Sequence, residues 1–136
     1  MDDAVNQSIV PGKAKEADIS ASLADIPGLD LELGLAIYDG EEDIYQLVLR
    51  SFVSDARAVA DKLRAVSRET LHDYYIGVHG LKGISANVGA VDVHQFAARL
   101  TSLAQAGDLD GVLSENEALI ASVNSLVSDI EGCLGS

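Results

Sequence analysis

The chain has 136 residues, of which 48% are hydrophobic and 4% aromatic, and its formal net charge is −13. This length suits one domain with one core. The strong negative charge argues against binding nucleic acid or anionic lipid through the overall electrostatic field of the protein. No apolar run approaches the roughly 18–20 residues of a membrane span, and no secretory signal is visible. A single cysteine, Cys133, rules out an internal disulfide and fits a reducing compartment. We expect a cytoplasmic protein.

The N-terminal segment, residues 1–18, is polar and shows no helical periodicity. It is predicted to be a flexible tail or linker that precedes one folded domain at residues 19–134. The two prolines, Pro11 and Pro27, lie in the first quarter of the chain, so nothing further along forbids long helices.

A short helix is expected first within the domain. Asp30 is a candidate N-cap for a helix over residues 31–38, because an aspartate side chain accepts hydrogen bonds from the free amides at a helix start. Asp39 and Gly40 follow and are predicted to end this helix.

Four longer segments then carry apolar residues at helical spacing. They cover residues 41–66, 67–89, 92–104 and 111–134. Asp92 and Gln95 resemble a capping box at the start of the third segment. The expected buried stripes are Tyr45, Leu49, Phe52, Ala56, Val59, Leu63 and Val66; Leu71, Tyr74, Val78, Leu81, Ser85 and Val88; Val93, Phe96, Ala97, Leu100 and Ala104; and Leu113, Ile120, Val123, Val127, Ile130 and Leu134.

The connections between these helices are short, which makes sequential helices antiparallel neighbours. We therefore predict an all-α fold, an antiparallel up-down-up-down four-helix bundle with a short additional N-terminal helix. No strand pattern and no internal repeat competes with this interpretation.

Glycine is concentrated in the second long segment, around His79. Gly77, Gly80 and Gly83 would together cost about 2–3 kcal/mol relative to alanine in a helix. Gly77 lies toward the expected core, where glycine permits close helix packing. Gly80 and Gly83 lie beside His79, where small residues leave room for another protein to approach.

On a helical wheel, His79 lies opposite the stripe through Leu81 and Val88, so its side chain is expected to face solvent. A solvent-exposed imidazole is a nucleophile at neutral pH, and its free nitrogen can attack an electrophilic phosphorus. A cation one turn away, such as Lys82, can hold the phosphoryl oxygens. The residues within about 60° of His79 on the wheel are His72, Tyr75, Ile76, Lys82, Gly83 and Ala86.

The stretch "HGLKGISANVGA" resembles the signature of histidine-containing phosphotransfer (HPt) domains: His, any residue, Leu-Lys-Gly, and Gly-Ala some residues later. "GLDLELGLAIYDGEEDIYQLVLRSF" is similar to the family's short helix, turn and long helix, and "AGDLDG" to its link to the last helix. The resemblance covers residues 19–134, and the family fold agrees with the predicted bundle.

The resemblance implies a histidine phosphotransfer module in a two-component phosphorelay. His79 would accept the phosphoryl group and Lys82 would stabilise it. The partner would be a response-regulator receiver domain or a hybrid sensor histidine kinase, which supplies the aspartate and Mg²⁺. The domain itself would be a monomer that needs no cofactor or metal and has no kinase activity of its own. The expected partner-binding residues are Tyr75, Gly80, Gly83 and Ala86.

Two positions depart from the common family pattern. Gly80 stands where a residue with a side chain, such as Thr or Ser, is more usual. Thr101 stands where many members carry Gln or Glu, which hydrogen-bonds the imidazole. Both departures bear on the rate of transfer and the lifetime of the phosphohistidine.

Two other functions fit parts of this sequence pattern. The first is an interaction bundle that binds a receiver without accepting phosphate; an intact His79 and Lys82 argue against it. The second is a metal site formed by His72 and His79 with the carboxylates of Glu69 and Asp73, but the two histidines are two turns, or about 10 Å, apart along the helix. His72 and His94 are interpreted as ordinary surface residues.

Overall fold

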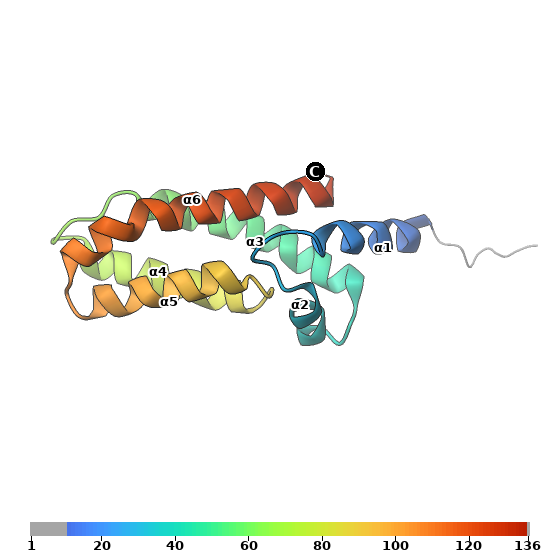
Figure 1. Ribbon diagram of the computed structural model, residues 1–136, viewed down its shortest axis with the longest axis horizontal. Coiled ribbons are helices and arrows are strands. Elements are labelled where there is room, and N and C mark those ends of the chain that lie inside the picture. The colour runs from blue at the N-terminus through green and yellow to red at the C-terminus, as the bar shows by residue number, and fades with distance from the viewer. Residues whose placement is uncertain (1–10, 136) are drawn as a thin grey trace, which may run out of the picture.

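The computed structural model describes residues 11–135, which form six α-helices and no strand. Figure 1 shows the last four helices side by side, each entered at the end where the previous one finishes. This arrangement confirms the predicted all-α fold and its four-helix bundle. No helix in this part of the chain has both the length and the apolar character needed to cross a membrane. The helices are α1 (Pro11–Leu23), α2 (Leu31–Ile37), α3 (Glu42–Leu63), α4 (Leu71–Ala86), α5 (Val91–Gln105) and α6 (Leu109–Leu134).

The core of the bundle is built from the apolar stripes of α3 to α6, largely as their spacing predicts. Leu113 is an exception, because its side chain is 51% exposed while Val112 is fully buried. Position 113 lies about 80° around the helix from Val123, the centre of the buried face, and so falls at the edge of the stripe. The prediction that Leu113 faces the core is therefore wrong.

The structure contains two helices before the bundle, where the sequence predicted one. Residues 11–18, expected to be part of a flexible tail, belong to α1, and residues 1–10 lie outside the described part of the chain. The Gln46 side chain in α3 donates to the Glu16 carbonyl oxygen at 2.9 Å and to Ser20 Oγ at 3.3 Å. These contacts are polar, and hydrophobic periodicity does not report polar contacts. The hydrophobic pattern of the sequence therefore gives no sign of the contact between α1 and α3.

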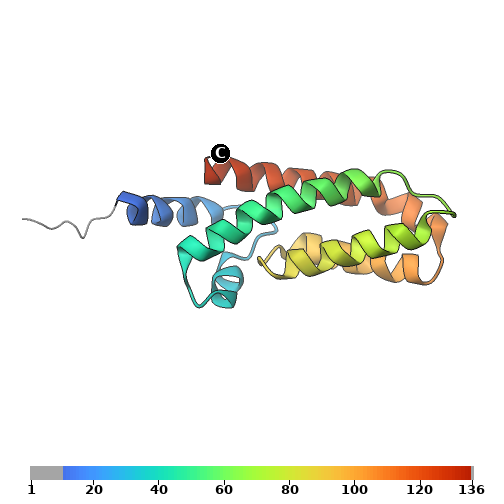
Figure 2. The same ribbon diagram turned by 180° about the vertical axis from the view of Figure 1, so that it is seen from behind.

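Helix α2 lies across the end of α4, beside the turn that leads into α5 (Figure 2). The Asp30 amide donates to the Gly89 carbonyl oxygen at 2.8 Å, and the Tyr38 hydroxyl donates to the Asn87 carbonyl oxygen at 2.9 Å. Asp30 also accepts from the Leu33 amide at 3.0 Å, which confirms the predicted N-cap. The end of α4 is thus held by hydrogen bonds to residues that flank α2.

The starts of α5 and α6 differ from the predicted ones. Asp92 lies inside the first turn of α5, and the N-cap residue is Ala90, which has no side-chain cap. The predicted capping box is therefore wrong. The Asp92 carboxylate still interacts favourably with the positive N-terminal end of the helix dipole. In α6, Asp108 accepts from the Gly111 amide at 2.9 Å, so the helix starts at Leu109 rather than at residue 111.

Candidate functional site on the exposed face of α4

The middle of α4 presents His79 to solvent. Its neighbours Val78 and Leu81 are fully buried, whereas His79 itself is exposed. Helix α4 packs against α3 and α5, and no other described element covers the face that carries His79. The predicted exposure of His79 is confirmed.

Lys82 lies one helical turn beyond His79, and its side chain is half-buried. Within residues 15–135, the ion pairs join Arg57 to Glu131, Arg64 to Asp61 and Arg99 to Glu115, and none involves Lys82. Its ammonium group therefore has no carboxylate partner among these residues and is available to an anion placed over the helix.

The backbone of Lys82 has a partner in α5. His94 Nδ1 lies 3.0 Å from the Lys82 carbonyl oxygen. A carbonyl oxygen only accepts, so Nδ1 must carry the hydrogen. His94 is half-buried, and the interpretation of it as an ordinary surface residue is corrected here. Nothing in the local sequence signals this contact, because its acceptor is a backbone atom twelve positions away.

The glycines of α4 divide into two kinds. A Cβ atom built on Gly80 or Gly83 meets no atom of another described element within 4 Å. A Cβ atom on Gly77 would lie 3.1 Å from Leu63 Cδ2 in α3. Packing within the described part of the domain therefore explains glycine at position 77 but not at 80 or 83. The predicted core-facing place of Gly77 is confirmed, and Gly80 and Gly83 leave open space beside His79.

An aromatic column runs along the same face. The rings of Tyr75 and His79 are stacked, with centroids 5.8 Å apart and planes 5° from parallel. The rings of His72 and Tyr75 are also stacked, with centroids 6.3 Å apart. Ala86 is exposed two turns beyond His79. Of the expected partner-binding residues, the structure thus brings Tyr75 into contact with His79, and it leaves Ala86 on the same exposed face.

Thr101 does not take the place of the family's glutamine. Its hydroxyl is buried in α5 and donates to the Ala97 carbonyl oxygen at 2.7 Å. Among the described residues, no side chain or backbone group hydrogen-bonds to the His79 ring. The orientation of the imidazole therefore depends on something other than Thr101.

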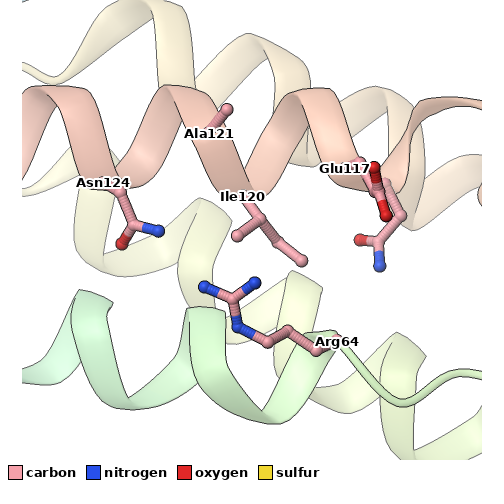
Figure 3. Close-up of a pocket in the computed structure, with 6 residues that line it drawn as sticks. Arg64, Glu117, Ile120, Ala121 and Asn124 are labelled. Atoms are coloured by element: carbon pink, nitrogen blue, oxygen red, sulfur yellow. The ribbon is translucent and has the colours of Figure 1, made fainter.

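Five hollows in the described part of the chain do not include His79 in their lining, although Tyr75 lines one between α4 and α5. One of about 370 Å³ opens between the end of α3 and α6, where Figure 3 shows the Arg64 side chain extending toward Ile120. It contains no residue of α4. Within residues 11–135, no three His, Cys, Asp or Glu residues are grouped so as to hold a metal ion. The candidate site is therefore a helix face with one nucleophile and one cation.

Comparison with protein families identifies the family of this chain. The model of the Hpt domain family matches residues 47–131, which is more than half of the chain and includes all of α4 and α5. Comparison with curated proteins and with solved structures gave no match. The chain belongs to the Hpt domain family.

Proposed function

We propose that His79 accepts a phosphoryl group from an aspartate of a response-regulator receiver domain and passes it to the aspartate of a second receiver. Membership of the Hpt family implies histidine phosphotransfer in a phosphorelay. The observation that carries the assignment to His79 is its position: an exposed imidazole at the middle of α4, with open space at Gly83 and, one turn away, Lys82, which has no ion-pair partner among the described residues.

The transfer requires little from the helix besides the nucleophile. The unprotonated ring nitrogen of His79 attacks the phosphorus of an aspartyl phosphate, a nitrogen–phosphorus bond forms, and the oxygen–phosphorus bond to the carboxylate breaks. The aspartate leaves as a carboxylate, so no proton has to be removed from the attacking nitrogen. Transfer to the second receiver is the reverse reaction with a different carboxylate.

Lys82 has the electrostatic role in this proposal. The phosphoryl group carries negative charge in both the reactant and the product, and an ammonium group beside it forms charge-assisted hydrogen bonds with its oxygens. The remaining charge would be neutralised by Mg²⁺ bound to the receiver, which also contributes the aspartate. The partner is therefore a receiver domain, either free-standing or attached to a hybrid sensor kinase.

Gly80 and Gly83 have a steric role in the proposal. Transfer needs the two reacting atoms about 3–3.5 Å apart, so the rim of the receiver site must come close to the backbone of α4. The space left by both glycines permits this approach. Tyr75 and Ala86 would lie at the edges of the contact.

The direct test is incubation with a receiver that has been phosphorylated with radioactive phosphate. We expect an acid-labile, base-stable label on the native chain and none on His79→Gln. A labelled His79→Gln would mean that another residue is the acceptor. A native chain that binds the receiver without taking label would identify a receiver-binding bundle instead. ATP alone is expected to give no label, and incorporation from ATP would contradict a carrier without kinase activity.

A further inference from the structure

The ring of His79 contacts one aromatic side chain, Tyr75, in the part of the chain that the structure describes. The two planes are within 5° of parallel at a centroid separation of 5.8 Å, which is the range in which aromatic rings attract one another. Tyr75 precedes His79 by four residues, so the helix itself places the two side chains one above the other.

The stack with Tyr75 can orient the His79 imidazole, which has no other orienting contact among the described residues. The second torsion of a histidine side chain is broad, so an exposed ring on a helix samples many orientations. The family's usual orienting position, Thr101, has its hydroxyl bonded to the Ala97 carbonyl oxygen instead. The parallel contact with Tyr75 restricts the ring plane of His79 without using either ring nitrogen.

Tyr75 is itself held in place. Its side chain is half-buried and packs against the core. It lines a hollow between α4 and α5 together with Leu71 and Ala104, and the His72 ring also stacks on it. The phenol ring is therefore a fixed platform, whereas His79 projects further into solvent.

We infer that Tyr75 is a positioning residue for the phosphotransfer proposed above, and the inference rests on that function. Tyr75 holds the His79 imidazole in one plane with both ring nitrogens free, one to attack phosphorus and the other to carry the hydrogen. In this chain the ring stack replaces the hydrogen bond that a glutamine at position 101 would provide. The phenol hydroxyl is not required, because the contact is made by the ring.

The test compares Tyr75→Phe, which keeps a ring, with Tyr75→Leu and Tyr75→Met, which keep apolar bulk but remove the ring. His72→Ala is the matched control, because it removes the other ring that stacks on Tyr75 and leaves Tyr75 against His79. Circular dichroism establishes that each variant is folded. Two apolar replacements are included so that the test survives if one of them fails to fold.

The first measurement is the proton NMR spectrum of the unphosphorylated protein, with the His79 ring signals assigned from their loss in His79→Gln. We expect the ring current of Tyr75 to shift these signals upfield in the native chain, in Tyr75→Phe and in His72→Ala. The shift should disappear in Tyr75→Leu and Tyr75→Met. Unchanged ring signals in both apolar variants would overturn the inference.

The second measurement is the rate of phosphorylation by two donors. Phosphoramidate transfers its phosphoryl group with loss of ammonia and needs no protein docking, whereas a phosphorylated receiver must dock. The stacking free energy of an aromatic pair predicts a rate about three- to tenfold lower with both donors in Tyr75→Leu, and a rate near the native one in Tyr75→Phe. A decrease with the receiver alone would make Tyr75 a docking contact and overturn the positioning role.

These measurements separate the inference from the proposed function. If the native chain took no label from either donor, His79 phosphorylation would be refuted, while the ring shifts would still report the stack. If the native chain is labelled and Tyr75→Leu is labelled at the native rate by both donors, the function holds and the positioning role is refuted.

Discussion

The Tyr45 ring lies directly against Gly34 and leaves no room for a side chain at position 34. A Cβ atom on Gly34 would lie 2.6 Å from Tyr45 Cε1, and also 2.6 Å from the Val88 carbonyl oxygen. The Tyr45 hydroxyl is buried and donates to that same oxygen at 2.8 Å. Helix α2, helix α3 and the turn that follows α4 meet at this point, so the glycine allows α2 to pack against α3 and this turn.

Gly34→Ala should therefore destabilise the domain. The added methyl group cannot move away from backbone and from a buried tyrosine at the same time, and overpacking of this kind costs about 1–3 kcal/mol. Urea unfolding followed by circular dichroism at 222 nm measures the loss. Ala36→Gly, at an exposed position of the same helix, is the control for the change in helix propensity. A Gly34→Ala variant as stable as the native chain would show that α2 does not pack closely here.

Gly83→Ala should have the opposite effect on stability. Position 83 has open space around it, so alanine adds helix propensity without a clash and raises the free energy of unfolding by about 0.5–1 kcal/mol. If a receiver approaches over this residue, the same change should slow phosphotransfer from the receiver, and Gly83→Leu should slow it further.

Gly132→Ala provides the matched control for position 83. Gly132 lies in α6 and also has no neighbour within 4 Å among the described elements. Gly132→Ala should raise the free energy of unfolding by a similar amount and leave the rate of phosphotransfer unchanged. Equal transfer rates in Gly83→Leu and the native chain would contradict the proposed docking face.

The parts of the fold that the sequence predicted correctly depend on local periodicity. The spacing of Leu71, Val78 and Leu81 sets the buried side of α4, and the opposite side, with His79, follows from helix geometry alone. The helical wheel also predicted correctly that Gly77 faces the core and that Gly83 lies on the exposed face.

The features that the sequence did not predict depend on partners far away along the chain. Helix α1 shows no helical apolar periodicity, and the Gln46 side chain donates to a backbone oxygen of this helix 30 positions earlier in the chain. The bond from His94 to Lys82 likewise ends on a backbone atom. The stack of Tyr75 on His79 was within reach of the sequence, since a four-residue spacing places both rings on one face. Its parallel geometry required coordinates.

A buried polar chain joins three helices of the bundle. The Tyr74 hydroxyl in α4 donates to Asn116 Oδ1 at 2.8 Å, and Asn116 Nδ2 in α6 donates to the Leu63 carbonyl oxygen at 2.7 Å. Burial raises the pKa of Tyr74 above its ordinary value of 10.0. Burial, and then the charges of Tyr38 and Asp30, raise the pKa of Tyr45 in the same direction.

These raised pKa values predict a loss of stability in alkaline solution. Below pH 10 both tyrosines are protonated in the folded and the unfolded chain, so their contribution is fully present. Above pH 10 the unfolded chain releases protons that the folded chain retains, and the free energy of unfolding falls by up to about 1.4 kcal/mol per pH unit for each tyrosine. Urea titrations at pH 8, 9, 10 and 11 should show a flat region followed by this decline. A constant stability up to pH 11 would contradict the burial of both phenols.

Tyr74→Phe should separate two effects of that tyrosine. At pH 8 the variant should be less stable by about 1–3 kcal/mol, because Asn116 Oδ1 loses its donor in a buried position. Above pH 10 its stability should fall less steeply than that of the native chain, because one of the two buried phenols is gone. The same urea titrations measure both. A parallel decline in the two proteins would mean that Tyr74 ionises equally easily when folded and unfolded.

His94→Ala tests the contact between α5 and the backbone of Lys82. The Lys82 carbonyl oxygen belongs to α4, and the half-buried His94 imidazole in α5 donates a hydrogen bond to it. Removal of the donor should lower the free energy of unfolding by about 0.5–1.5 kcal/mol, measured by urea unfolding at pH 8. Gln95→Ala, at the next and exposed position of α5, is the control and should change stability by less than about 0.5 kcal/mol. Equal losses in the two variants would assign the effect of His94 to α5 alone and contradict a hydrogen bond that ties α5 to α4.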